Sequence, residues 1–366
     1  MPKPSAPRVS NKAMTILSVL LLSGDGDAQL SSMSTALQNI TQEEFDALLE
    51  LAHSNHVIVR GMEVFRGIML AAQDHIRAEW AATAIATERA RIVKAVGFLR
   101  LIRDAFDEEG LDVTVIKSLD HWPDFGSDID LYTNAPSQAV CALMRSRFGA
   151  QIASRSWGDR LACKWNFDIP GLPDPVEVHT GRLGQTGEQL LLASRLPERA
   201  RLLEFDGQSF RVPSASDRLM ISTLQRMYRH FYFRLCDIVD SAALAASGAI
   251  DYDELRSSAQ AAGIWEGVAT YLVIVSDYVR RYRGEGLVLP KFVKDSAHFN
   301  GDIVYLGGSF LRVPILPQSV GLYRSQMTGL LRRRELHSSA RLGLLPWLAT
   351  AAAIGHKITG SDKGIW

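Results

Sequence analysis

The segment VTVIKSLDHWPDFGSDIDLY, residues 113–132, decides which fold this sequence predicts. Residues 113–116 are short and β-branched, which is typical of a buried strand. A loop containing Pro123 and Gly126 follows, and residues 128–132 then alternate charged or polar with apolar side chains, as a second strand does. Asp128 and Asp130 therefore leave the same face of that strand, ~6.6 Å apart along the backbone at ~3.3 Å per residue.

Two carboxylates on one strand face favour a divalent metal site. They can converge on one ion, or on two ions ~3.5–4 Å apart as phosphoryl-transfer sites require. Glu177, between two valines on a later predicted strand, supplies a third acid. Acids among β-branched residues are costly to bury unless a cation compensates them, and Mg²⁺ prefers a few carboxylates plus substrate phosphates. The alternative for an isolated Asp-x-Asp is a solvated strand edge or a turn cap.

Helical patterns flank this region on both sides. Thr41 and Glu44 predict a capping box, and apolar residues at steps of three and four from Ile92 to Phe106 predict a long helix. We expect a disordered stretch at 1–12, a helical region at 13–109, an α/β core at 110–212, a helical region at 213–284, and a C-terminal extension with an apolar helix at 285–366. The predicted fold class is α+β, a small mixed β-sheet core flanked by N-terminal and C-terminal helical regions.

The composition is that of an ordinary globular protein. Forty basic residues balance forty acidic residues, so general nucleic-acid binding is not expected. The three cysteines, Cys141, Cys163 and Cys236, show neither zinc-ligand spacing nor a disulfide framework. Reduced thiols favour a cytoplasmic location.

Two apolar stretches could be mistaken for membrane signals. Residues 16–22 are short and lack a cleavage pattern, so we expect a packed helix there. Residues 342–355 are too short to cross a bilayer comfortably. For these we favour a buried helix, and the alternative is a membrane-surface or protein contact through 342–358, which would make the protein peripheral to a membrane.

An ordered set of motifs resembles a known superfamily. Ile116-Lys117-Ser118, a spacer of nine residues and then Asp128-Ile129-Asp130-Leu131 are followed by Glu177-Val178-His179 and by an acidic helix at 235–240. This order resembles the DNA polymerase β-like nucleotidyltransferases, and most closely a bacterial subfamily described only as uncharacterised nucleotidyltransferases. The resemblance covers roughly residues 15–280.

The resemblance implies transfer of a nucleotidyl group from an NTP to an unidentified hydroxyl acceptor. Asp128 and Asp130 match the paired carboxylates that hold two Mg²⁺ or Mn²⁺ ions. Glu177 matches the third carboxylate, which helps to activate the acceptor hydroxyl. The expected nucleotide-binding residues are Lys117, Ser118, Ser127, Arg226 and His230.

Two departures from the family pattern favour an alternative function. Ser118 stands where glycine is expected, which costs backbone freedom in a phosphate loop. Asp124 stands near where relatives carry arginine, and an acid there would repel phosphate. The alternative is a catalytically inactive fold that serves as a binding or regulatory module. A nucleotide-sugar glycosyltransferase is disfavoured because only one predicted strand precedes the Asp-x-Asp pair.

Several further side chains have two interpretations each. His179 either positions a phosphate or acceptor or is simply hydrogen-bonded, and Arg226, Arg229 and His230 either line a cleft or form a solvated helix face. Arg155, Arg160 and Lys164 predict a basic surface cluster. Asp237 and Asp240 are expected to cap a helix or pair with the arginines rather than bind metal.

Overall fold

The computed structural model describes residues 11–23, 28–184, 188–205, 207–314, 317–318 and 320–359. Most of the stretch predicted to be disordered, residues 1–10, lies outside this range, and the helix that follows already begins at Asn11. Helices account for 62% of the structure and strands for 12%, so the predicted α+β class is correct.

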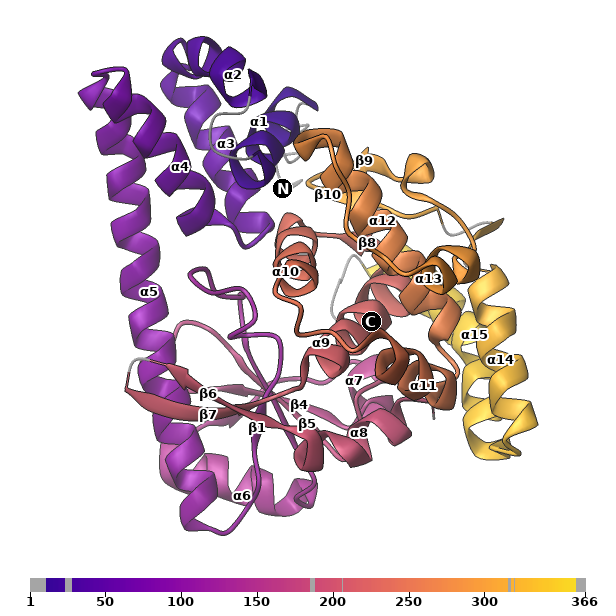
Figure 1. The fold of residues 1–366 in the computed structure, drawn as a ribbon. Helices are drawn as coiled ribbons and strands as arrows, with labels where there is room; N and C mark the ends of the chain where they lie inside the picture. The colour runs from indigo at the N-terminus through magenta and orange to yellow at the C-terminus, as the bar shows by residue number, and fades with distance from the viewer. Residues whose placement is uncertain are drawn as a thin grey trace.

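Five helices of the described chain precede the first strand. They are α1 (Asn11–Leu22), α2 (Ala28–Gln38), α3 (Gln42–Ser54), α4 (Ile58–Ala71) and α5 (His75–Glu108). The predicted capping box begins α3, because the Thr41 hydroxyl accepts the Glu44 N–H and the Glu44 carboxylate accepts the Thr41 N–H. Helix α5 has 34 residues, which is about 51 Å at 1.5 Å per residue. It therefore reaches from the other N-terminal helices to the sheet (Figure 1).

The central sheet has five strands in the order β1-β2-β5-β4-β3. They are β1 (Thr114–Val115), β2 (Ile129–Thr133), β3 (Gln151–Ile152), β4 (Lys164–Asp168) and β5 (Val176–Thr180). Strands β2 and β5 are parallel, whereas the other pairs are antiparallel. Helices α6 (Ser137–Phe148) and α7 (Trp157–Leu161) lie between these strands in sequence, and the hairpin β6 (Arg201–Phe205) and β7 (Gln208–Val212) follows after α8 (Glu188–Arg199).

Apolar side chains form two separate cores. One lies against the sheet and contains Ile92, Leu99 and Phe106 of α5 together with Val140 and Met144 of α6. Figure 1 shows α6 below the strands and α5 running along their side. Each of these side chains is buried. The sheet thus has a packed apolar layer of its own.

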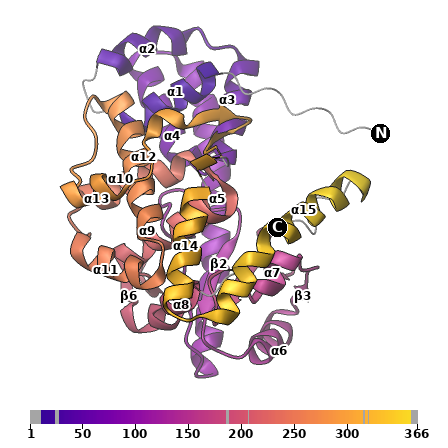
Figure 2. The same ribbon diagram turned by 90° about the vertical axis from the view of Figure 1, so that its right-hand side faces the viewer.

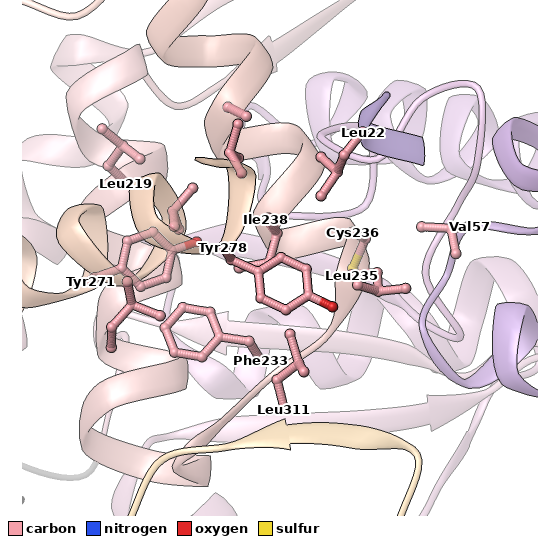
Figure 3. Close-up of a cluster of buried hydrophobic side chains, with 14 of the residues drawn as sticks. Leu22, Val57, Leu219, Phe233, Leu235, Cys236, Ile238, Tyr271, Tyr278 and Leu311 are labelled. Atoms are coloured by element: carbon pink, nitrogen blue, oxygen red, sulfur yellow. The ribbon is translucent and has the colours of Figure 1, made fainter. Parts of the chain in front are cut away.

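The second core joins both ends of the sequence. It combines α1–α4 with helices that follow the sheet, namely α9 (Ala215–Thr223), α10 (Leu235–Ala246), α11 (Tyr252–Ala262), α12 (Trp265–Arg283) and α13 (Lys291–Ser296). Figure 3 shows Leu22 and Val57 beside Leu235 and Tyr278 in this cluster. The two predicted helical regions are therefore packed together in space.

A three-stranded sheet in the C-terminal part was not predicted. The π-helix η1 (Leu224–His230) leads to β8 (Tyr232–Phe233), which pairs with β10 (Phe310–Arg312), and β10 pairs with β9 (Tyr305–Gly307) after the 3-10 turn η2 (Gly301–Ile303). Strands of two or three residues are too short to show the alternation of apolar and polar residues by which a strand is predicted from sequence.

The last two helices, α14 (Val320–Arg332) and α15 (Leu336–Thr359), lie side by side, and α15 extends outward beyond α14 (Figure 2). The expectation of a buried apolar helix is met at Leu342, which is 2% exposed, but not at Leu344 and Trp347, which are 56% and 75% exposed. Among the described residues, no helix has the length and apolar character needed to cross a bilayer.

Candidate carboxylate site

The strand register brings two of the predicted acids together. In the parallel β2–β5 pair, Asp130 lies opposite Glu177 and Tyr132 lies opposite His179. Side chains on opposed positions of neighbouring strands leave the same sheet face. One donor atom each from Asp130, Glu177 and His179 lies within 4.8 Å of the others. Asp128 precedes the first residue of β2 and is partly exposed.

The electrostatics place Asp128 in the same cluster. Burial, followed by the negative charges of Asp130 and Glu177, raises the pKa of the Asp128 carboxyl to about 7. Burial alone would also raise the pKa of Asp130, but the nearby Lys117 and His179 lower it below its ordinary value. The ammonium of Lys117 lies 2.6 Å from Oδ1 of Asp130. The negative charge of Asp128 is thus repelled by the charges of Asp130 and Glu177.

The loop after β1 holds this cluster through Ser118. The Ser118 side chain accepts a 2.8 Å hydrogen bond from the backbone N–H of Asp130, and its hydroxyl lies 3.3 Å from the carbonyl oxygen of Asp128. The residue that adopts a glycine-like backbone is Lys117, with φ of 63°. The expectation that serine costs backbone freedom at 118 is therefore wrong, because the left-handed conformation is required one residue earlier.

Asp124 does not face the carboxylates as an extra repulsive charge. It is buried and accepts the backbone N–H groups of Val59 at 2.6 Å and Arg60 at 3.3 Å, which are among the first residues of α4. Its second partner is the Arg60 guanidinium at 2.8 Å. Asp124 thus caps a helix whose own N-cap residue, Val57, provides no side-chain hydrogen bond. The expected repulsion of phosphate by Asp124 is wrong because its charge is compensated.

Lys164 was expected in a surface cluster, but it belongs to the site. Its side chain is only 9% exposed and lies 2.8 Å from Glu177 and 3.1 Å from Asp159. On β4, Lys164 lies two residues before Asn166, which is the residue opposite Glu177 of β5. The side chains of Lys164 and Asn166 therefore leave the same face of the strand. The sequence did not show this, because the burial of Lys164 depends on the partner strand that carries Glu177.

His179 is a buried imidazole with free bonding capacity. Burial lowers its pKa below the ordinary histidine value, which favours the neutral ring. Neither ring nitrogen has a hydrogen-bond partner among the described residues, and Nε2 lies 3.8 Å from Oδ1 of Asp130. This separation from Asp130 is longer than an ordinary hydrogen bond, and both interpretations of His179 stay predictions. An unpaired buried nitrogen beside three carboxylates is suited to bind an ion or a ligand.

Two of the other predicted nucleotide-binding residues differ in their exposure to solvent. Ser127 is exposed at the entrance of β2. Arg226 is only 2% exposed and lies 2.7 Å from Asp237, which also accepts the Arg234 N–H at the start of α10. Burial of Arg226 leaves no surface for a nucleotide. The prediction that Arg226, Arg229 and His230 share one α-helical face assumed regular α-helical spacing. Residues 224–230 instead form a π-helix, which has wider turns.

His230 stays close to the site despite this irregularity. Burial, and then the positive charges of Arg229, Arg226 and Lys117, lower its pKa well below the ordinary value.

A small pocket of about 20 Å³ borders Lys117, Asp120 and Arg218. That volume holds about one water molecule, so the described pocket lies beside the carboxylates and is not large enough for a nucleotide.

No protein-family model matches this sequence, and the curated proteins contain no significant relative. Carboxylate oxygens of Asp130 and Glu177 and the imidazole of His179 lie close enough together to hold one divalent cation, and Asp128 adds a carboxylate that interacts with both acids. The residues present thus fit Mg²⁺ or Mn²⁺.

Proposed function

We propose that this protein is a metal-dependent nucleotidyltransferase that moves a nucleotidyl group from an NTP to a hydroxyl acceptor. The observation that supports it most is the in-register pairing of Asp130 with Glu177, with the raised pKa of Asp128 beside them. Negative charge concentrated on one sheet face calls for a divalent cation. The order of the motifs along the chain supports the same chemistry.

The reaction would be an in-line displacement. The acceptor oxygen forms a bond to the α-phosphorus, the bond from that phosphorus to the bridging oxygen breaks, and pyrophosphate leaves. In this reaction Glu177 would take up the hydroxyl proton, and Lys117 would pair with the triphosphate as a point charge. Divalent ions held by Asp128, Asp130 and Glu177 would stabilise the charge on the entering and leaving oxygens.

A second candidate function rests on the ion pairs of the site. Lys117 with Asp130 at 2.6 Å and Lys164 with Glu177 at 2.8 Å neutralise two of the acids with the chain's own cations. Such pairs are what an inactive binding or regulatory module would need to keep these acids buried. In the enzyme, the two ammonium groups instead move to the phosphates when metal and NTP bind.

A labelling experiment separates the two functions. The protein is incubated with each α-labelled NTP, Mg²⁺ or Mn²⁺ and cell extract, and the labelled product is isolated. The enzyme transfers α-label but no γ-label, because pyrophosphate carries the γ-phosphate away. Glu177→Gln should abolish transfer, whereas Asp168→Asn, a change to an exposed acid on β4, should not. Transfer that survives Glu177→Gln contradicts the proposed role, and absence of transfer with every NTP favours the module.

A further inference from the structure

A second group of metal-binding side chains lies outside the carboxylate site. One donor atom each from His121, Cys236 and Asp240 lies within 4.8 Å of the others. His121 belongs to the loop between β1 and β2, whereas Cys236 and Asp240 are four residues apart on α10 and share one helix face. Imidazole, thiolate and carboxylate are the donor types that zinc accepts, in contrast to the oxygen-rich set that suits magnesium.

Asp240 connects the cluster to two basic side chains. Oδ2 of Asp240 lies 2.5 Å from Nδ1 of His121, and Oδ1 lies 2.6 Å from Arg60. Arg60 also pairs with Asp124 at 2.8 Å, so two carboxylates share its single positive charge. A cation bound by His121 and Asp240 would take the place of the proton that now joins Nδ1 to Oδ2.

The burial of Cys236 distinguishes a metal site from a catalytic thiol. Cys236 is 0% exposed, and Figure 3 shows its sulfur among apolar side chains such as Leu235, Val57 and Ile238. A substrate cannot reach a nucleophile that is enclosed in this way, whereas a single ion requires much less space. His121 and Asp240 border the small pocket of about 20 Å³, which holds about one water as a further ligand.

An independent observation also indicates a ligand here. The ring of His56 stacks on that of His121 with 6.0 Å between centroids. His56 is 9% exposed, and its Nε2 has no hydrogen-bond partner among the described residues. Buried polar atoms are rarely left unpaired. The unpaired Nε2 of His56, next to the cluster, is therefore a further donor available to a bound ligand.

We propose that His121, Cys236 and Asp240 form a binding site for a thiophilic divalent metal such as Zn²⁺. The bound ion connects α10 to the loop that carries Lys117 and Ser118, and through Arg60 to the start of α4. It thereby fixes the loop on which the carboxylate site depends. This site uses none of the residues assigned to the nucleotidyltransferase reaction, so it stands whether or not that reaction occurs.

Cobalt titration tests the proposal, since Co²⁺ replaces zinc and a thiolate ligand gives a charge-transfer band in the near ultraviolet. The metal-free full-length protein is titrated with Co²⁺ and bound metal is quantified by mass spectrometry. We expect one ion with a thiolate band for each chain. Cys236→Ser should remove the band and weaken binding by about tenfold or more, while Cys163→Ser should retain both.

Two further results decide the assignment. The double variant Asp130→Asn with Glu177→Gln should keep the thiolate band, because the carboxylate site is separate. His121→Gln should weaken binding while circular dichroism shows a folded protein. Absence of a thiolate band in the unaltered protein, or its persistence in Cys236→Ser, would overturn the proposal. The first of these outcomes needs no variant, so it holds even if Cys236→Ser fails to fold.

Discussion

Ser118 and Asp130 are joined by a 2.8 Å hydrogen bond in which the Asp130 backbone N–H donates to Oγ of Ser118. Ser118 is 2% exposed, so water cannot replace the hydroxyl. The bond fixes the loop after β1 to the start of β2, which carries Asp130 and directly follows Asp128. Its loss should therefore affect both the stability of the fold and the position of the carboxylates.

Replacement of Ser118 by glycine, the residue that the superfamily pattern favours, should weaken the protein. The buried N–H of Asp130 would lose its partner, which costs about 1–3 kcal/mol of unfolding free energy. Urea denaturation of Ser118→Gly and Ser118→Ala measures this loss. Ser127→Ala, at an exposed position, should change stability by no more than about 0.5 kcal/mol. A Ser118→Gly variant more stable than the unaltered protein would contradict the assigned role.

The backbone at Lys117 predicts a difference between two variants that both remove the ammonium. With φ at 63°, any side chain at this position is strained by about 1–2 kcal/mol relative to glycine. Lys117→Gly should therefore be more stable than Lys117→Ala by about 1 kcal/mol. Chemical denaturation of the two variants measures the difference. Equal stabilities would show that the loop relaxes out of the left-handed conformation.

Asp124 should matter for stability and not for metal binding. Asp124→Ala removes the acceptor of the Val59 and Arg60 N–H groups and one partner of the Arg60 guanidinium. Hydrogen bonds to charged groups contribute about 1.5–3 kcal/mol each, so we expect a loss of at least about 2 kcal/mol. The affinity for Mn²⁺ should be unchanged in the folded variant. A rise in that affinity would restore the interpretation of Asp124 as a repulsive charge.

The pKa of Asp128 predicts how metal binding depends on pH. The folded value is raised from 3.8 to about 7, so Asp128 stabilises the metal-free fold while it is protonated. This contribution is present below its ordinary pKa and is lost as the pH rises through about 7. The lowered pKa of Asp130 affects the stability of the fold only at much lower pH.

A divalent metal must displace the Asp128 proton, so its affinity should rise about tenfold per pH unit up to about pH 7 and then level off. Calorimetric titration with Mn²⁺ between about pH 5 and about pH 8 measures this slope. Asp128→Asn is the control and should flatten it. A steep slope that persists in Asp128→Asn would assign the proton to another group.

The sequence predicted the local structure well where one segment contains its own signal. The capping box at Thr41 and Glu44 and the long helix that contains Ile92 and Phe106 were both visible in residue types alone. The strands that carry the acids were expected at almost the observed positions. Each of these features depends on neighbours within a few residues.

Contacts between distant segments could not be predicted in this way. The burial of Lys164 depends on its pairing with Glu177 across β4 and β5, and the role of Asp124 depends on α4, more than sixty positions earlier in the chain. The packing of α1–α4 against α10 and α12 likewise joins opposite ends of the sequence. One sequence shows which residues are apolar or charged, but not which of them meet.

Calorimetric titration with each NTP, in the presence and absence of Mg²⁺, tests the central claim most directly. The claim is that Asp128, Asp130 and Glu177 hold divalent ions that bind a triphosphate. We predict that at least one NTP binds only with metal present, and that the double variant Asp128→Asn with Asp130→Asn abolishes this binding while remaining folded. Nucleotide binding that is unaffected by removal of the metal, or that persists in the double variant, would contradict the claim.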